Sequence, residues 1–546
     1  MAMVECTSLS RRTMLQAGML AVSGAALHDP ALTGAAPARL TRIQADPTTL
    51  IIALGGSPSD IDPHSQYDYR STLAVRGPYE GLIGFKDGET DQYEGLIAER
   101  WEANADQSVW TFHLRPGVTF QDGSPCDAEA VRASYERLLT MGKGAFGVVA
   151  RFAPDPAQIT APDAQTVVFD LGKPQPLFEA AMAATLGVQV VNVKVAMEHE
   201  DAADQGNAWM TINAVGTGTG PYKIVQFEPG QQVVMERYEE YWGGWEGEHF
   251  DRIVVRIVEE AETRRQLIEQ GEVDLLDRFG VTYEALPELA QNPDLTIDRS
   301  TSTEVVYWTL TEAGPLATPE ARQAMNYAFP YDQVLEGYYR GFAKQAVGPV
   351  PDTVRGYAPD TFTYTTDLAK AKELFTTAGV AEGTEITLMQ QAGDETVALL
   401  LQANLAEIGI QLTIEAVDTT AFTATFYGDA PAEERPHVMG WSWWPDYNDA
   451  WNHLDPQVSC EGSANGGVYC NERVDELLVQ SRDAADPETY QMALAEAQQI
   501  LSRDDPSAIY YSQPEWTTVL QKDIQGFIFN PINLGTYDFR KLRRAP

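Results

Sequence analysis

Two stretches of the chain alternate between strand-like and helix-like segments, and this alternation limits the fold more than any other feature of the sequence. Residues 386–389 have the pattern of a strand, 397–408 that of a helix and 410–417 that of a second strand. The same order of strand, helix and strand recurs over 253–276. Such an order indicates α/β domains with mainly parallel, buried strands. No internal repeat or long charged linker separates these segments, so we expect interleaved or tightly packed domains.

The length and the other patterned segments agree with several domains. A chain of 546 residues is too long for one compact core, so two to four domains are expected. Asp127 is the expected N-cap of an amphipathic helix. Further strands are predicted at 49–54, 109–115, 222–227 and 232–237, and further helices at 318–328 and 368–378.

The N-terminus has the pattern of an export signal. Ser10-Arg11-Arg12 opens a twin-arginine motif, a short apolar run follows, and small residues stand at 36–38. We interpret residues 1–38 as a Tat signal peptide; the alternative is a chance arginine pair on a disordered tail. Cys6 precedes the arginines, which argues against a lipid anchor. No later segment approaches 18 uninterrupted apolar residues, so no membrane span is expected in the mature chain.

The charge of the chain excludes some classes of partner. The formal net charge is −41 at pH 7. Nucleic-acid binding needs a basic face, and adhesion to anionic lipid needs basic clusters, so neither is expected. An adaptation for solubility or high salt explains the charge more simply than recruitment of a cationic ligand.

The cysteines are expected to lie in an oxidising compartment if the chain is exported. Cys460 and Cys470 bracket a loop containing glycine and asparagine that is flexible enough to bring them together. We predict a disulfide between them; two free buried thiols are the alternative. Cys126 is left over and is expected to be buried.

The sequence lacks the usual signatures of catalysis. The seven histidines are scattered without zinc-ligand spacing, and neither a G-x-S-x-G elbow nor a Walker loop occurs. The glycine-rich stretch 216–220 leads into a strand, which does not suit a nucleotide-binding loop. We therefore expect no enzyme activity, no metal and no cofactor, with an exported hydrolase as the distant alternative.

One short stretch has the composition of a ligand-binding wall. Residues 442–451 read SWWPDYNDAW, with three tryptophans beside Asp446 and Asp449. A core seldom keeps two unpaired aspartates, and an ordinary surface seldom shows three indoles.

Several blocks of the sequence resemble the family 5 extracellular solute-binding proteins, the peptide- and nickel-binding receptors of ABC importers. These blocks are LIAERWEANADQSVWTFHLRPGVTFQDGSPCDAEAVRASYERL (96–138), GTGPYKIVQFEPGQQVVMERYEEYWGG (218–244), GEVD (271–274) and CNERVDELL (470–478). They occur in order along nearly the whole mature chain.

The resemblance implies an α/β fold of the periplasmic-binding-protein type II, with two lobes, a double hinge and an inserted extra domain. One lobe would comprise 49–88, 205–303 and 520–546, the extra domain 89–204, and the opposite lobe 304–519. A solute would bind in the cleft between the lobes, which closes by hinge motion.

The resemblance also implies roles for residues of the tryptophan-rich stretch. In peptide-binding members, a Trp-x-x-Asp-Tyr motif supplies an aspartate that pairs with the α-amino group of the ligand, and here that residue is Asp446. Trp443 and Trp444 would form an apolar wall, and the backbone around Ser442 would pair with an extended ligand. The candidate ligand-binding residues also include Tyr447, Asp449 and Ser57. For Asp449 and Trp451, a capping carboxylate and a core indole are the favoured alternative.

One departure from the family pattern bears on the ligand. Dipeptide receptors of this family have an arginine shortly after the strand equivalent to 386–389, and residues 390–395 here contain no basic residue. The departure favours a longer peptide, a cationic amine or a saccharide. We therefore predict an exported monomeric receptor, periplasmic or extracellular. It would capture an oligopeptide, or alternatively a saccharide or another organic solute, and deliver it to the permease of an ABC importer.

Overall fold

The computed structural model describes residues 46–484, 486–532 and 537–545. These residues belong to one compact unit, Arg42–Pro546. The predicted signal peptide, 1–38, lies outside the described residues.

A large mixed sheet forms the framework of this unit. Its strand order is β16-β15-β17-β13-β18-β11-β1-β10-β9-β8, and β12 and β14 pair with β18 in addition. We call β1, β8, β9, β10 and β11 the first half-sheet and β13, β15, β16 and β17 the second half-sheet. The strands are β1 (Thr49–Leu54), β8 (Tyr222–Glu228), β9 (Gln232–Arg237), β10 (Arg252–Ile257), β11 (Leu275–Leu276), β12 (Leu295–Thr301), β13 (Val305–Leu310), β14 (Ala343–Lys344), β15 (Glu385–Gln391), β16 (Gln411–Val417), β17 (Val438–Trp443) and β18 (Ala508–Gln521).

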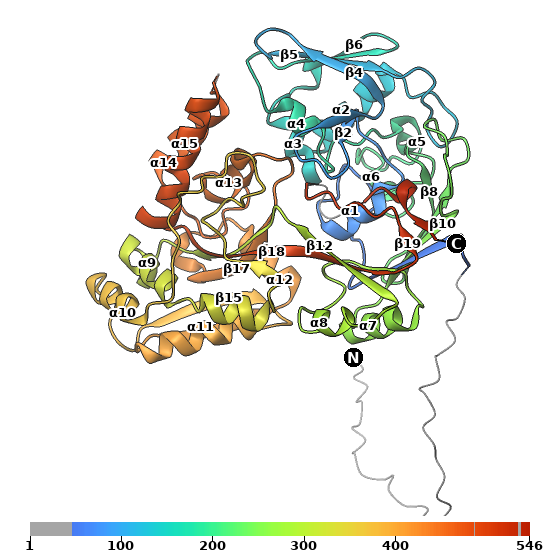
Figure 1. Cartoon of the computed structure of the whole chain (residues 1–546). Helices are drawn as coiled ribbons and strands as arrows, with labels where there is room; N and C mark the ends of the chain where they lie inside the picture. The colour runs from blue at the N-terminus through green and yellow to red at the C-terminus, as the bar shows by residue number, and fades with distance from the viewer. Residues whose placement is uncertain (1–45, 485, 533–536, 546) are drawn as a thin grey trace, which may run out of the picture. The chain divides into compact units, whose positions relative to one another are not determined.

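Strand β18 joins the two half-sheets. Its N-terminal part pairs with β13, and its C-terminal part pairs with β11 and β12. Figure 1 shows β18 and β12 running between the two halves of the sheet. The chain also crosses from one half to the other between Thr301, where β12 ends, and Val305, where β13 begins.

The prediction of mainly parallel strands is wrong for this sheet as a whole. The parallel pairs are β1 with β10 and β11, and β15 with β16 and β17. All other pairs in the sheet are antiparallel. These are the β8–β9 hairpin and its neighbour β10, the pair of β13 and β17, and the long strand β18 with each of its neighbours β11, β12, β13 and β14. The strand–helix–strand segment of β15, α11 and β16 is parallel as predicted.

A separate four-stranded sheet has the order β4-β5-β7-β6. In β5, Trp110, Phe112 and Leu114 are buried and alternate with partly exposed residues, which agrees with the sequence pattern. Helix α2 packs on this sheet, and the side chain of Asp127 accepts a hydrogen bond from the backbone N–H of Ala130 at 3.0 Å, as expected of its N-cap. The strands are β4 (Ala98–Ala103), β5 (Val109–Leu114), β6 (Ile159–Asp163) and β7 (Thr166–Asp170).

Short strand pairs and helices complete the described residues. Two small sheets pair β2 (Ile83–Phe85) with β3 (Tyr93–Gly95) and β19 (Ile524–Gln525) with β20 (Arg543–Arg544). The α-helices are α1 (Tyr69–Arg76), α2 (Ala128–Met141), α3 (Gly147–Ala150), α4 (Phe178–Met182), α5 (Val193–Met197), α6 (Asn207–Met210), α7 (Ala261–Gln270), α8 (Leu286–Leu289), α9 (Pro319–Ala328), α10 (Leu368–Thr377), α11 (Thr396–Glu407), α12 (Thr419–Phe426), α13 (Ala450–Val458), α14 (Glu472–Arg482) and α15 (Pro487–Gln499).

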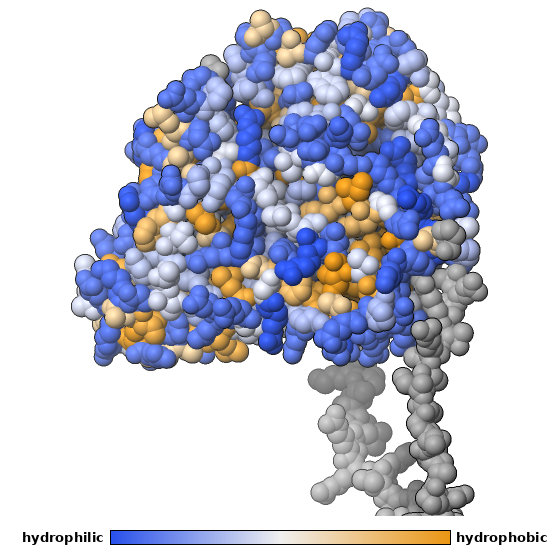
Figure 2. All heavy atoms as spheres, viewed as in Figure 1, coloured by the Kyte–Doolittle hydropathy of each residue, from blue (hydrophilic) through white to orange (hydrophobic). Residues whose placement is uncertain are grey.

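The cysteines have the arrangement predicted from the sequence. Cys460 and Cys470 form a disulfide, and Cys126 is buried and free. In the described part of the chain, no helix has both the length and the apolar character needed to cross a membrane. Figure 2 shows that hydrophilic residues dominate the face seen there, with apolar residues gathered in patches toward its middle.

Candidate functional site

A cavity of about 520 Å³ lies where the two half-sheets meet. Its walls come from the N-terminal end of α1, the loop after β11, and strands β13, β15 and β17. Half of its 24 lining residues are aromatic. Both the volume and this lining are typical of a site for a small organic ligand.

The end of β17 and the loop after it form one wall of the cavity. Strand β17 pairs with β13 on one side and β15 on the other, so its carboxyl end opens between them. Four predicted residues line the cavity here, namely Ser442, Trp443, Trp444 and Asp446. The indole N–H of Trp443 is buried and has no hydrogen-bond partner among the described residues.

Asp446 is a half-buried carboxylate at this wall. The Tyr67 hydroxyl donates a hydrogen bond to its Oδ1 at 3.0 Å, and the Asn452 side chain lies beside its other oxygen. Burial raises the pKa of Asp446 above its ordinary value, and the two hydrogen-bonding side chains and Arg151 offset this only in part. A cation placed beside this carboxylate would therefore be bound favourably.

The other predicted ligand residues lie away from the cavity wall. Tyr447 is fully buried in the core, and its side chain is not part of the wall. Asp449 is also fully buried and caps α13, accepting a hydrogen bond from the backbone N–H of Trp451 at 2.8 Å and another from Tyr490 at 2.8 Å. Ser57 hydrogen-bonds the backbone of its own loop and of Gly230, and it does not line the cavity either.

Asp449 and Trp451 lie away from the cavity because each has partners within the protein. Burial raises the pKa of Asp449 to about 6, and the Arg355 guanidinium and the Tyr490 hydroxyl lower it. The side chain therefore has its own protein partners, as the capping alternative requires. Trp451 is a core indole with the Arg151 guanidinium 5.2 Å from its ring centre, again as in that alternative.

Sequence reasoning missed an ion pair in the cavity wall. Arg278 follows β11, and its Nη2 lies 3.0 Å from Oε2 of Glu304, the residue before β13. The Arg278 side chain is 8% exposed and that of Glu304 is 1% exposed. Arg278 is the only basic residue among those that line the cavity in the described chain. An arginine two residues after a buried strand was the available signal, but nothing in the neighbouring sequence indicates its partner.

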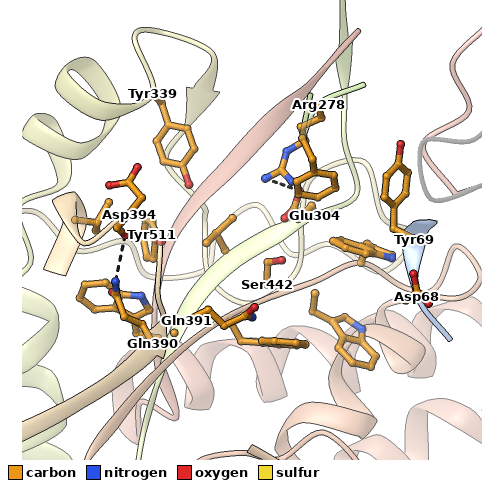
Figure 3. Close-up of a pocket in the computed structure, with 18 of the residues that line it drawn as sticks. Asp68, Tyr69, Arg278, Glu304, Tyr339, Gln390, Gln391, Asp394, Ser442 and Tyr511 are labelled. Carbon is orange, nitrogen blue, oxygen red and sulfur yellow. Dashed lines mark hydrogen bonds and ion pairs between the residues drawn. The ribbon is translucent and has the colours of Figure 1, made fainter. Parts of the chain in front are cut away.

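Polar groups are distributed around the cavity. In the view of Figure 3, Asp394 and Gln390 lie at one side and Asp68 and Tyr69 at the other, with Arg278, Glu304 and Ser442 between them. The Gln390 amide donates a hydrogen bond to the Asp394 carbonyl at 3.1 Å. The described residues contain no group of three or more histidine, cysteine or acidic side chains arranged to hold a metal ion.

Comparisons with known proteins relate the chain to one family of bacterial proteins. The model of the bacterial extracellular solute-binding proteins, family 5 (middle region), matches residues 92–465. The chain is 29% identical over 494 residues to the probable D,D-dipeptide-binding periplasmic protein DdpA of Escherichia coli, covering 88% of this chain and 92% of that one. It is 27% identical over 467 residues to the glutathione-binding protein GsiB of Salmonella paratyphi A, covering 84% and 87%.

Solved structures share the fold over nearly the whole length. The periplasmic binding protein DppA from Helicobacter pylori, in complex with the peptide STSA, superposes with a TM-score of 0.77 at 25% identity, covering 91% of this chain and 98% of that one. The dipeptide-binding protein of a Pseudoalteromonas species, in complex with Met-Leu, has a TM-score of 0.79 at 22% identity, covering 91% and 100%. The latter similarity concerns the fold alone.

Proposed function

The chain belongs to the bacterial extracellular solute-binding proteins of family 5, and from this premise we propose that it captures an oligopeptide in the cavity between the half-sheets. Proteins of this family are solute-binding receptors of ABC importers rather than enzymes. The receptor would close around the peptide and deliver it to the membrane permease of its importer.

The observation that carries the proposal is the environment of the Asp446 carboxylate. Its carboxylate has a raised pKa, lies half-buried in an aromatic wall and receives only neutral hydrogen bonds from Tyr67 and Asn452. The α-ammonium group of a peptide would supply a charged donor, and charge-assisted hydrogen bonds are stronger than neutral ones. The aromatic wall adds cation–π attraction of about 0.5–2 kcal/mol.

A saccharide is the second candidate, because sugar rings stack on indoles. The rings of this wall are partly engaged already. Trp441 stacks on Phe422 and Phe426, with ring centres 5.4 and 4.9 Å apart. Trp444 meets Trp516 edge to face at 6.2 Å. Less indole surface therefore remains for a sugar than the sequence suggests, which favours the peptide.

We extend the proposal to the domains and to export. Residues 49–88, 205–303 and 520–546 would form one lobe, 89–204 the extra domain and 304–519 the opposite lobe. The chain passes between the half-sheets at 302–304 and again near the middle of β18, a few residues before the proposed lobe boundary at 519–520, and these two crossings would act as the hinges. Residues 1–38 would direct Tat export, and the mature receptor would act as a monomer in the periplasm or outside the cell.

A thermal-unfolding experiment with matched variants tests the ligand assignment. A pool of di- to tetrapeptides is added to the wild type, to Asp446→Asn and to Asp449→Asn. A ligand at 100 times its Kd adds about 2.7 kcal/mol of stability, so a clear rise in Tm is expected for the wild type and Asp449→Asn. Asp446→Asn should show little or no rise. Peptide binding that survives in Asp446→Asn would refute the role of Asp446, and turnover of the peptides would refute the receptor.

A further inference from the structure

The walls of the main cavity carry an excess of negative charge. Four carboxylates line it in the described chain, those of Asp68, Glu304, Asp394 and Asp446, against the one guanidinium of Arg278. The ion pair of Arg278 with Glu304 balances one of these carboxylates, so three remain without a cation in the wall. Inside a cavity such charges are screened less than on an open surface, and they attract positively charged solutes.

Asp68 and Asp446 differ in what engages them. Asp68 caps α1, because its Oδ1 accepts hydrogen bonds from the backbone N–H groups of Arg70 at 2.9 Å and Ser71 at 3.0 Å. Its Oδ2 accepts another from the Ser59 hydroxyl at 2.7 Å, so this carboxylate finds its donors within the protein. The charge of Asp446 is assigned above to the α-ammonium group of the peptide.

The Glu304 carboxylate is buried with too few donors. Its side chain is 1% exposed, and neither oxygen has a hydrogen bond of good geometry among the described residues, although Nη2 of Arg278 lies 3.0 Å from Oε2 and the Ser442 hydroxyl lies nearby. A buried acceptor without a donor is costly, and more so when it is charged. This wall therefore favours a ligand that brings donors and positive charge. A further carboxylate is disfavoured, because Arg278 already balances Glu304.

Asp394 has no partner of opposite charge. It is exposed, accepts a hydrogen bond from the backbone N–H of Thr396 at 3.0 Å and forms no ion pair with the described residues. The rings of Tyr283, Tyr338 and Tyr339, which also line the cavity, contact one another with centres 4.8–5.9 Å apart. Burial raises the pKa of Tyr338, and the nearby Asp394 carboxylate raises it further. A carboxylate beside a cluster of aromatic rings is a favourable environment for an ammonium or guanidinium group.

Asp394 and Asp446 lie at different sides of the cavity. Asp446 accepts a hydrogen bond from Tyr67, and Asp68, the next residue along the chain, lies at the side opposite Asp394 in Figure 3. Both carboxylates nevertheless line the same cavity of about 520 Å³. One ammonium group does not serve both of them, so a ligand that satisfies both carries two positive charges.

We propose that the cavity selects peptides of net positive charge, whose α-ammonium group lies at Asp446 and whose lysine or arginine side chain reaches Asp394. This inference rests on the function proposed above and narrows it to one chemical class of peptide. The apolar stem of such a side chain can pack on the tyrosine rings while its charged head meets the carboxylate. An acidic side chain would instead face charges of its own sign, which is unfavourable.

Selection from a peptide pool measures this preference. The wild type captures peptides from a pool of di- to tetrapeptides of random sequence, and mass spectrometry identifies them. We expect lysine and arginine to be enriched and aspartate and glutamate to be depleted among the captured peptides. Calorimetry then compares the most enriched peptide with its counterpart that has glutamine in place of the basic residue. The basic peptide should bind about tenfold more tightly.

The outcomes separate this inference from the proposed function. Capture of peptides without enrichment of basic residues, or equal affinities of the basic peptide and its glutamine counterpart, would overturn the inference and leave the proposed function intact. If no peptide is captured, the proposed function fails, and this inference fails with it.

A variant of Asp394 tests where the second charge binds. Asp394→Asn keeps the oxygen that accepts the Thr396 N–H group, so it should fold. It should bind the basic peptide and the glutamine counterpart with similar affinity. Glu407→Gln removes the same charge from the far end of α11, away from the cavity wall, and should keep the full preference. A preference that persists in Asp394→Asn, or that falls equally in Glu407→Gln, would overturn the inference. If Asp394→Asn fails to fold, the comparison of the two peptides in the wild type still decides.

Discussion

Among the described residues, the ion pairs Arg137–Asp62 and Arg278–Glu304 have both side chains buried, and they differ in how fully their hydrogen bonds are satisfied. Arg137 donates to both carboxylate oxygens of Asp62 at 3.1 and 2.6 Å, to His64 Nδ1 at 3.0 Å and to the Gln205 carbonyl at 2.9 Å. Asn207 donates a further hydrogen bond to Asp62 at 2.9 Å. Both side chains of this ion pair are 0% exposed.

The pair of Arg278 and Glu304 is almost as buried, yet Arg278 meets Glu304 through one contact of 3.0 Å, and its Nε and Nη1 make no hydrogen bond of good geometry, although the Tyr283 hydroxyl lies near the guanidinium. Burial and charge are therefore shared by the two pairs and do not distinguish them. The number of satisfied donors distinguishes them, because a buried ion pair contributes to stability only when its remaining hydrogen bonds are completed within the protein. We accordingly assign a structural role to the first pair.

The largest expected effect is on stability when the first pair is changed. Arg137→Met leaves Asp62 as a fully buried, unpaired charge and leaves the His64 and Gln205 acceptors without their donor. The free energy of unfolding should fall by about 3–5 kcal/mol. Urea unfolding followed by fluorescence measures it. A loss below about 1 kcal/mol would contradict the structural role of this pair.

Neutral replacement of both members of each pair sharpens the contrast. Arg137→Gln/Asp62→Asn should still destabilise the protein by about 2–3 kcal/mol, because several charge-assisted hydrogen bonds are lost. Arg278→Gln/Glu304→Gln should change stability by less than about 1 kcal/mol, because a poorly satisfied buried pair contributes little. Equal losses in the two double variants, measured by the same urea titration, would remove the distinction between the pairs.

The pH dependence of binding should follow Asp446. Its raised pKa means that protonation, and loss of the negative charge that attracts an ammonium group, begins at a higher pH than for an ordinary aspartate. Peptide affinity should fall as the pH is lowered through this pKa, and Asp446→Asn should lack that dependence. Calorimetry at several pH values tests this, and an affinity that is constant down to the ordinary aspartate pKa would contradict it.

The smallest expected effect is on the pH dependence of stability. The contributions of Asp62 and Glu304 to the free energy of unfolding should change with pH in opposite directions. Burial would raise the pKa of Asp62, but Arg137 and other partners hold it below 3.8, so its stabilising contribution is present above that pH and is lost on acidification. Burial raises the pKa of Glu304 above 4.5, and Arg278 and the Ser442 hydroxyl offset this only in part. Stability from Glu304 is therefore greatest below pH 4.5 and declines as the pH rises through the raised pKa.

Single variants should reveal these slopes. Relative to the wild type, Asp62→Asn should lose more stability at pH 7 than at low pH. Glu304→Gln should compare more favourably with the wild type as the pH increases. Tm values measured across the pH range provide the comparison, and slopes of the same sign for both variants would contradict the assigned pKa directions.

The sequence predicted the local elements better than their assembly. The order of β15, α11 and β16 followed from hydrophobic periodicity, which depends on neighbouring residues alone. The antiparallel pairing around β18 could not be predicted in this way, because that strand is far along the chain from the strands it joins.

The same limit applies to the candidate site. Asp446 and Asp449 are three residues apart in one motif, yet one lines the cavity and the other caps a helix. What separates them is contact with Tyr67 in one case and Tyr490 in the other, both distant in sequence. Arg278 was missed for the same reason, since its importance depends on Glu304 and on the donors left unpaired after folding.

Native mass spectrometry of the loaded receptor tests the central claim most directly. The protein is incubated with an equimolar mixture of di- to tetrapeptides and oligosaccharides, and the mass of the complex identifies the solute that it selects. We predict one bound peptide per chain, recovered intact on denaturation, and no such complex for Asp446→Asn. A bound oligosaccharide, or cleavage of the peptides, would contradict a peptide receptor.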